Sequence, residues 1–89
     1  MEFSEIKSKI KNFGKDHPTY WGCALAGEVG EACNLIKKFE RDGIDIKVKL
    51  ADELADVFIY TELTAQVFGI NLEQAIINKL KVIDDRRKA

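Results

Sequence analysis

Two pairs of acidic residues are the part of this sequence best suited to chemistry. Glu28 and Glu31 lie three positions apart in the segment GEVGEACNLIKKF, and Glu53 and Asp56 repeat this spacing in LADELADVFIY. Residues three apart share one helical face, so each pair projects two carboxylates from about one turn of helix. On a helical wheel, Glu28 and Glu53 are each surrounded by apolar side chains, where an unpaired negative charge is unfavourable.

Three interpretations could explain acids in apolar surroundings. A solvated, salt-bridged face requires Lys or Arg three or four positions away, and among the four acids only Glu53 has one, Lys49. Burial of all four in the protonated form is disfavoured, because two carboxylates 4 Å apart repel by about 4 kcal/mol at an effective dielectric of about 20. A divalent cation removes this repulsion. Ligands that are all oxygen favour Mg²⁺ or Mn²⁺ over zinc or copper, so a metal site is the favoured interpretation.

The type of metal chemistry follows from the residues that are present and absent. A diiron centre on a similar four-helix frame requires Glu-x-x-His motifs, and the one histidine, His17, lies in a predicted loop. Mg²⁺ bound by carboxylates keeps positions open for water and for substrate phosphates. It can neutralise charge on a polyphosphate and lower the pKa of a bound water. The residues alone therefore predict Mg²⁺-dependent phosphoryl chemistry.

Four helices are predicted to position these acids. Apolar residues at helical spacing place them at about residues 3–13, 20–41, 46–68 and 72–83. Residues typical of helix ends separate them: Thr19, Asp45 and Asn71 before a helix, and Gly14, Gly43 and Gly69 after one. A short connection joins the second and third helices, so we expect an antiparallel pair that brings the acids together. The predicted fold is all-α, a four-helix chain with a central antiparallel helical hairpin that assembles into an oligomeric helical bundle.

The helix predicted at residues 20–41 carries a second notable face, made of small residues. Gly22, Ala26, Gly30 and Cys33 fall in one narrow sector opposite Glu28, which favours close approach of another helix and predicts a central helix buried on two sides. Two cysteines ten positions apart on one helix are about 15 Å apart, too far for a disulfide. Cys23 and Cys33 are therefore expected to be small buried thiols in a reducing compartment.

Length and charge limit the class of protein. The 89 residues suffice for one domain, residues 1–89, whose core would be marginal alone because such a chain buries only about 60–65% of its unfolded surface. Oligomerisation or a metal is the expected support. A net charge of −1 gives no reason to expect nucleic-acid or membrane partners. No signal-peptide pattern or membrane-spanning apolar run is visible, so we expect a cytoplasmic protein.

The two acidic pairs also carry a family resemblance. The pattern GEVGE…ELAD, followed by GINLEQAIINKL, resembles the MazG-type nucleoside triphosphate pyrophosphohydrolases of the all-α NTP pyrophosphatase superfamily, over nearly the whole chain. The resemblance implies hydrolysis of (deoxy)nucleoside triphosphates to the monophosphate and pyrophosphate, as a nucleotide-pool house-cleaning activity. It also implies a homodimer or homotetramer. The implied catalytic residues and Mg²⁺ ligands are Glu28, Glu31, Glu53 and Asp56. One of these, or Asp52, would orient the attacking water.

Two positions depart from the family pattern. Gly27 occupies a position where many relatives have glutamate, and Ile83 one where asparagine is frequent, whereas Lys79 and Arg86 match basic positions. These departures affect the binding of the triphosphate or the sugar that the family pattern implies, and with it the expected level of activity. The alternative function is a non-catalytic helical oligomerisation or nucleotide-binding module that retains the fold.

Three further residues are candidates for contact with the substrate. Lys79 and Arg86 are candidates to bind phosphates, including across a subunit boundary; the alternative is that they are solvated charges that suit the end of a helix. Trp21 shares the face of Glu28 and could stack on a nucleobase, although core packing also explains an aromatic residue there.

Overall fold

The computed structural model describes residues 1–11 and 18–88, and within them the chain is entirely helical and loop, without strands. Its four helices are α1 (Phe3–Lys9), α2 (Pro18–Asp42), α3 (Lys47–Val67) and α4 (Leu72–Lys88). The predicted all-α fold is thus confirmed. His17, Phe13 and Gly14 lie outside the described residues.

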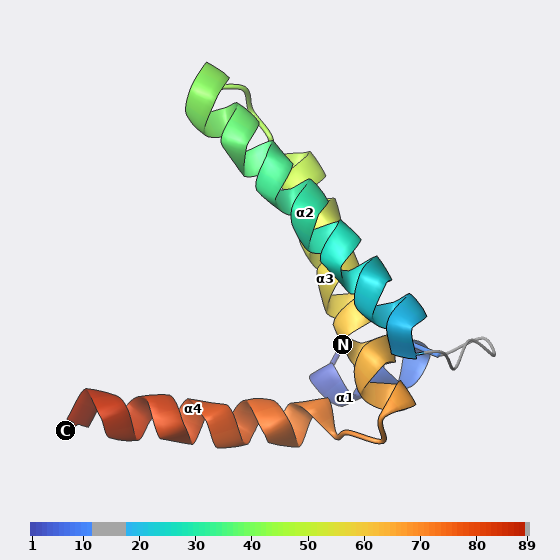
Figure 1. Cartoon of the computed structure of the whole chain (residues 1–89). Helices are drawn as coiled ribbons and strands as arrows, with labels where there is room; N and C mark the ends of the chain where they lie inside the picture. Colours follow the sequence, from blue (N-terminus) through green and yellow to red (C-terminus); the bar gives the residue numbers. More distant parts are fainter. Residues whose placement is uncertain (12–17, 89) are drawn as a thin grey trace.

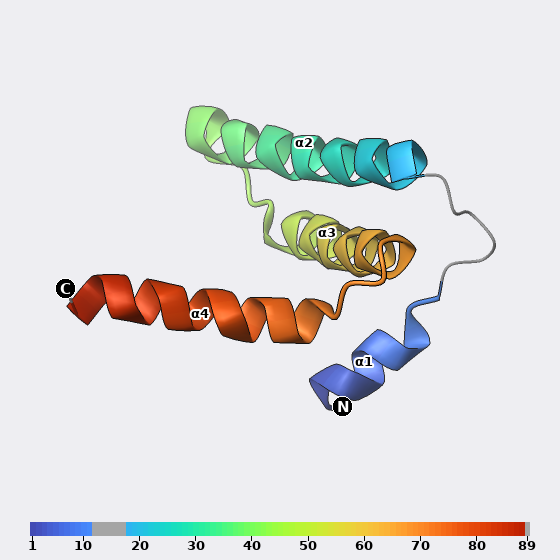
Figure 2. The same ribbon diagram turned by 60° about the horizontal axis from the view of Figure 1, so that its bottom comes forward.

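Helices α2 and α3 form the central structure of the protein. They run antiparallel and side by side (Figures 1 and 2) and are joined by residues 43–46. Gly43 adopts φ +66°, and its N–H donates to the Phe39 carbonyl at 2.8 Å, which ends α2 as glycine commonly does. The Asp45 carboxylate then accepts the Lys47 N–H at 3.1 Å. The predicted antiparallel hairpin is confirmed, with α3 beginning at Lys47 and not at residue 46.

The ends of the other helices differ in part from expectation. α2 begins at Pro18, two residues earlier than predicted, because the fixed φ of proline suits the first turn of a helix. α1 ends at Lys9 and not near residue 13. Its next residue, Ile10, is extended, and the Ile10 carbonyl accepts a hydrogen bond from the Gln66 side chain at 2.7 Å. This tertiary bond replaces continuation of the helix.

Helix α4 starts where the capping residues predict but continues further. The Asn71 side chain accepts the Gln74 N–H at 3.0 Å, and the Gln74 side chain donates to Asn78 and does not complete a capping box. The segment 84–88 was expected to lie beyond the helix, yet α4 reaches Lys88. Basic residues in the last turn interact favourably with the helix dipole, and Asp84 lies four residues before Lys88 in the favourable order of charges.

Very little of this chain is buried. Among the described residues the buried apolar side chains are Trp21, Ala32, Leu63 and Ala65. The radius of gyration is 15.6 Å, against about 12 Å for a compact domain of this length. α4 leaves the end of α3 and diverges from the hairpin (Figure 1). None of the described helices has the length and apolar character needed to cross a membrane.

The direction of α4 overturns one expectation about α2. Cys23 and Cys33 are free thiols, as predicted, but both are exposed and not buried. A Cβ added at Gly22 or Gly30 would meet nothing within 4 Å. The prediction that α2 is buried on two sides is therefore wrong for the single chain, because α3 covers one face and α4 does not reach the other.

Candidate metal centre

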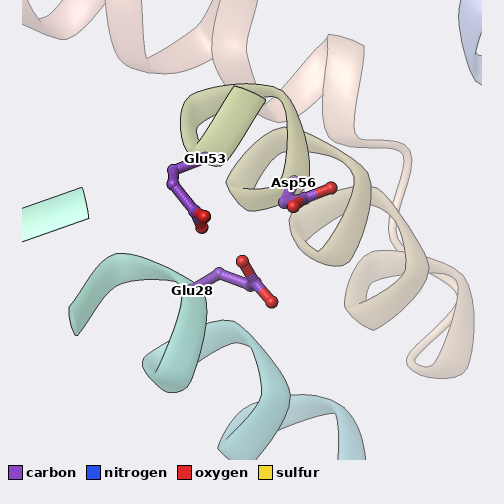
Figure 3. A group of neighbouring side chains, drawn as sticks. All are labelled: Glu28, Glu53 and Asp56. Atoms are coloured by element: carbon purple, nitrogen blue, oxygen red, sulfur yellow. The ribbon is translucent and has the colours of Figure 1, made fainter. Parts of the chain in front are cut away.

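The hairpin brings three of the four predicted acids together. Glu28 comes from α2, and Glu53 and Asp56 come from α3. One carboxylate oxygen from each lies within 4.8 Å of the others. All three side chains are half-buried. Figure 3 shows Glu28 and Glu53 directed toward each other from facing helices, with Asp56 beside them. We call these three residues the acid cluster.

Two oxygens in the acid cluster have no hydrogen-bond donor. Glu28 Oε2 and Glu53 Oε2 are both buried, and neither has a hydrogen-bond partner among the described residues. A buried polar atom left unsatisfied costs about 1–3 kcal/mol, and more if it is charged. A cation that accepts several oxygen ligands would satisfy both atoms. The donor set, carboxylate oxygens without sulfur or nitrogen, fits a hard divalent ion.

The acids perturb one another's ionisation. Hydrogen bonding with the Glu28 carboxyl group raises the pKa of Glu53 above its ordinary value of 4.5. Burial and the charges of Glu28 and Asp56 raise it further, while hydrogen bonding with Glu31 lowers it. The pKa of Glu31 is raised as well, first by hydrogen bonding with Glu53 and then by the Glu53 charge. Ionisation of Glu53 and Glu31 is therefore opposed unless a positive charge is present.

Glu31 occupies the edge of the acid cluster. It is exposed, it interacts with Glu53, and it is not one of the three acids whose oxygens converge. It also lines a hollow of about 570 Å³ between α2 and α3, which we call the lysine hollow. The hollow is lined by Glu31, Asn34, Leu35, Lys38, Val48, Lys49, Asp52 and Glu53. Two basic groups thus face a space that begins at the acids.

A second hollow, of about 410 Å³, lies on the other side of the acid cluster. We call it the aromatic hollow, because Trp21, Tyr20 and Tyr60 line it together with Asp56. The Trp21 ring is 4.8 Å from that of Tyr20 and 5.9 Å from that of Tyr60, centroid to centroid. Trp21 is only 5% exposed, so it packs in the small core and lines the hollow at once.

The structure does not bring Lys79 and Arg86 to these acids. Both residues lie on α4, both are exposed, and neither lines the lysine hollow or the aromatic hollow. Their contact with phosphate stays a prediction. The two departures from the family pattern, Gly27 and Ile83, also line neither of the two hollows.

A comparison with protein families identifies the family to which this chain is related. A family model described as the MazG nucleotide pyrophosphohydrolase domain matches residues 17–88. The chain belongs to the MazG family. No significant match was found among curated proteins or among solved structures. The predicted resemblance is confirmed, and the all-α hairpin with its acids is the MazG domain of this chain.

Lys38, Lys49 and Glu62 are not among the site residues that the sequence predicts. Lys38 lies seven positions after Glu31 and so shares its helical face. Lys49 lies four before Glu53 and was noted only as a charge partner. Both signals were present in the spacing. Glu62, which is buried, gave no signal, because its burial depends on the packing of α1.

Proposed function

We propose that this MazG domain hydrolyses (deoxy)nucleoside triphosphates to the monophosphate and pyrophosphate with Mg²⁺ as the cation, as a house-cleaning activity on the nucleotide pool. The observation that carries the proposal is the pair of buried, unpartnered oxygens of Glu28 and Glu53 beside Asp56. Membership of the MazG family supports nucleotide pyrophosphohydrolysis. A cytoplasmic location, without nucleic-acid or membrane partners, belongs to the same proposal.

The acids have different proposed roles at this centre. Glu28, Glu53 and Asp56 would hold Mg²⁺, or Mn²⁺ in its place, and Glu31 at the edge would complete the ligand set. The bound cation would neutralise charge on the phosphates and lower the pKa of a water. Asp52 lines the lysine hollow beside Glu53, where its carboxylate can accept a hydrogen bond from the attacking water and orient it.

The two hollows suit the two ends of a nucleotide. Lys38 and Lys49 in the lysine hollow can donate charged hydrogen bonds to phosphate oxygens. Trp21 and Tyr60 in the aromatic hollow offer ring faces on which a nucleobase can stack. Since Glu53 borders one hollow and Asp56 the other, a nucleotide that spans both would place its phosphates beside the acids. Hollows of this volume fall in the ordinary range for small-molecule sites.

A homodimer or homotetramer is part of the proposal. The chain has an accessible surface of 6867 Å², about 1,600 Å² more than a folded monomer of its mass ordinarily exposes. A standard interface buries about 800 Å² per partner, so a second copy is the occupant that the uncovered faces of α2 and α4 suit. In such an assembly Lys79 and Arg86 would contact the phosphates bound to a neighbouring subunit.

Release of pyrophosphate tests the function directly. The purified protein is incubated with each (deoxy)nucleoside triphosphate and Mg²⁺, and pyrophosphate and monophosphate are both measured. Equal amounts of the two products, lost on removal of Mg²⁺ with EDTA, are the expected result. No product from any nucleotide, with the protein folded and assembled, would contradict hydrolysis and would indicate a non-catalytic module.

A further inference from the structure

Glu62 is a buried carboxylate that the proposed chemistry does not use. It lies on α3 and is 4% exposed. Its Oε2 accepts a hydrogen bond from the Gln66 side chain at 2.9 Å, while its Oε1 is buried without a hydrogen-bond partner. Lys7 Nζ approaches Oε1 to 4.0 Å and supplies the opposite charge. Glutamate is almost never fully buried unless it is paired, and here Gln66 and Lys7 are the groups that pair with it.

The groups around Glu62 connect three helices. The Gln66 Nε2 that donates to Glu62 also donates to the Ile10 carbonyl at the end of α1, at 2.7 Å. Lys7 of α1 donates to the Asn71 side chain at 3.4 Å, and the same Asn71 oxygen caps α4. The polar contacts that hold α1 thus meet at one buried carboxylate of α3.

Helix α1 depends on these contacts for its position. It has seven residues and none of them is buried, and an isolated helix of this length is not stable in water. Besides the polar contacts, the Phe3 ring packs edge-on against Phe58 at a centroid distance of 5.4 Å. Loss of the Glu62 contacts would leave α1 held by this aromatic pair and by the hydrogen bonds of Gln66 to Ile10 and of Lys7 to Asn71, whose side chains Glu62 would no longer position.

The end of α1 is also a wall of the aromatic hollow. Lys9, Ile10 and Lys11 line that hollow opposite Trp21 and Asp56. Ile10 is the residue whose carbonyl Gln66 holds. Glu62 itself lines neither hollow and is not in the acid cluster, so it can act on the nucleotide only through α1.

We propose that Glu62 is a positioning residue for nucleotide binding. Through Gln66 and Lys7 it holds the end of α1 against α3, and this closes the aromatic hollow around the base and sugar. The inference rests on the proposed function, because it requires a nucleotide in the aromatic hollow. It assigns to Glu62 the affinity for the nucleoside part of the substrate and leaves the affinity for Mg²⁺ to the acid cluster.

The test compares Glu62→Leu, which removes both oxygens and keeps the bulk, with Glu62→Gln, which keeps the acceptor for Gln66. Lys7→Met removes the ion pair with Glu62 and the hydrogen bond to Asn71 from the α1 side, and it decides the question if Glu62→Leu does not fold. Glu5→Leu makes the matched change at an exposed position of α1. Three quantities are measured: hydrogen exchange of the amides of residues 3–10, binding of a non-hydrolysable deoxynucleoside triphosphate with Mg²⁺, and the rise in melting temperature caused by Mg²⁺ alone. Trp21 is the one tryptophan of the chain, so its fluorescence reports the binding.

Glu62→Leu is expected to speed hydrogen exchange in α1 and to weaken nucleotide binding about tenfold. The affinity falls because the end of α1, which lines the aromatic hollow, must then be ordered when the nucleotide binds. Glu62→Gln should retain most of the affinity for the nucleotide. The rise in melting temperature caused by Mg²⁺ should be the same in the Glu62 variants as in the wild type. Glu5→Leu should match the wild type in all three measurements. Unchanged exchange in α1, or released α1 with unchanged affinity, would overturn the role of Glu62. A wild-type protein that binds no nucleotide would instead overturn the proposed function, and this inference with it.

Discussion

Glu28 of α2 and Glu53 of α3 face each other across the hairpin, and each buries a carboxylate oxygen that no donor satisfies (Figure 3). Two helices that pack through apolar residues thus hold like charges at the centre of their contact. The packing of α2 on α3 and the repulsion between the acids oppose each other. A divalent cation removes the conflict, and the following predictions depend on it.

Replacement of a single ligand should separate fold from activity. Glu53→Gln keeps the size of the side chain and removes one charge of the acid cluster. Pyrophosphate release should fall by at least about 100-fold, while the far-UV circular dichroism stays helical. Glu40→Gln, the same change at an exposed position near the end of α2, should retain activity. Similar rates for Glu53→Gln and wild type would exclude Glu53 as a ligand.

Mg²⁺ should stabilise the folded protein. At a concentration 100 times its dissociation constant, a ligand that binds only the folded state adds about 2.7 kcal/mol. For a domain of this size that corresponds to a rise in melting temperature of about 10–20 °C. Differential scanning calorimetry with Mg²⁺ and then with EDTA measures the effect. A wild-type melting temperature that is indifferent to Mg²⁺ would contradict the metal centre.

The metal-free protein should lose stability as the pH rises. Because the folded state raises the pKa of Glu53 and of Glu31, their contribution to stability is fully present below about pH 4.5, the ordinary value. It is lost as the pH rises through the raised values. In EDTA, the melting temperature of Glu53→Gln should exceed that of the wild type by a margin that grows from pH 4.5 to neutrality. A constant margin would show that the acids do not interact.

The lysine hollow predicts which basic side chains bind the triphosphate. Lys38→Met and Lys49→Met should each raise the KM for a triphosphate about tenfold, since hydrogen bonds to charged groups are worth about 1.5–3 kcal/mol. The turnover number should change less. Lys37→Met is the control, because Lys37 is the neighbouring lysine and does not line the hollow. Equal effects of Lys37→Met and Lys38→Met would mean that only net charge matters.

The exposed apolar face of α4 predicts self-association. Leu80 is 58% exposed in the single chain, and sedimentation velocity of the wild type should give a dimer or a tetramer. Leu80→Glu should shift the protein toward the monomer. Lys81→Glu places the same carboxylate on the next exposed position and should leave the assembly intact. A wild-type protein that sediments as a monomer at micromolar concentration would contradict the assembly.

The sequence was sufficient to predict the hairpin and the grouping of three of its four acids. The spacing of Glu28 and Glu31, repeated by Glu53 and Asp56, depends only on helical geometry, and the stop at Gly43 depends on local backbone conformation. Such signals are local in the sequence, so they do not depend on how the rest of the protein packs. The family resemblance followed from the same residues.

What the sequence did not predict depends on how separate helices are placed. The exposure of Cys33 follows from the direction that α4 takes after Gly69, which has φ +67°. The early end of α1 depends on a hydrogen bond between Gln66 and Ile10, residues 56 positions apart, and the burial of Glu62 depends on the packing of α1 against α3. The assignment of one domain to residues 1–89, and the phosphate contacts of Lys79 and Arg86, stay predictions.

The short connection at residues 43–46 also shapes the route by which the protein folds. The acids are drawn from two helices that are neighbours in the chain, so the contacts between them have low contact order and form early. Association with a second copy of the chain is slower than formation of the hairpin and depends on protein concentration. Nascent chains would therefore bring their carboxylates together before any assembly exists, and free Mg²⁺ would accelerate the first step of folding but not the second.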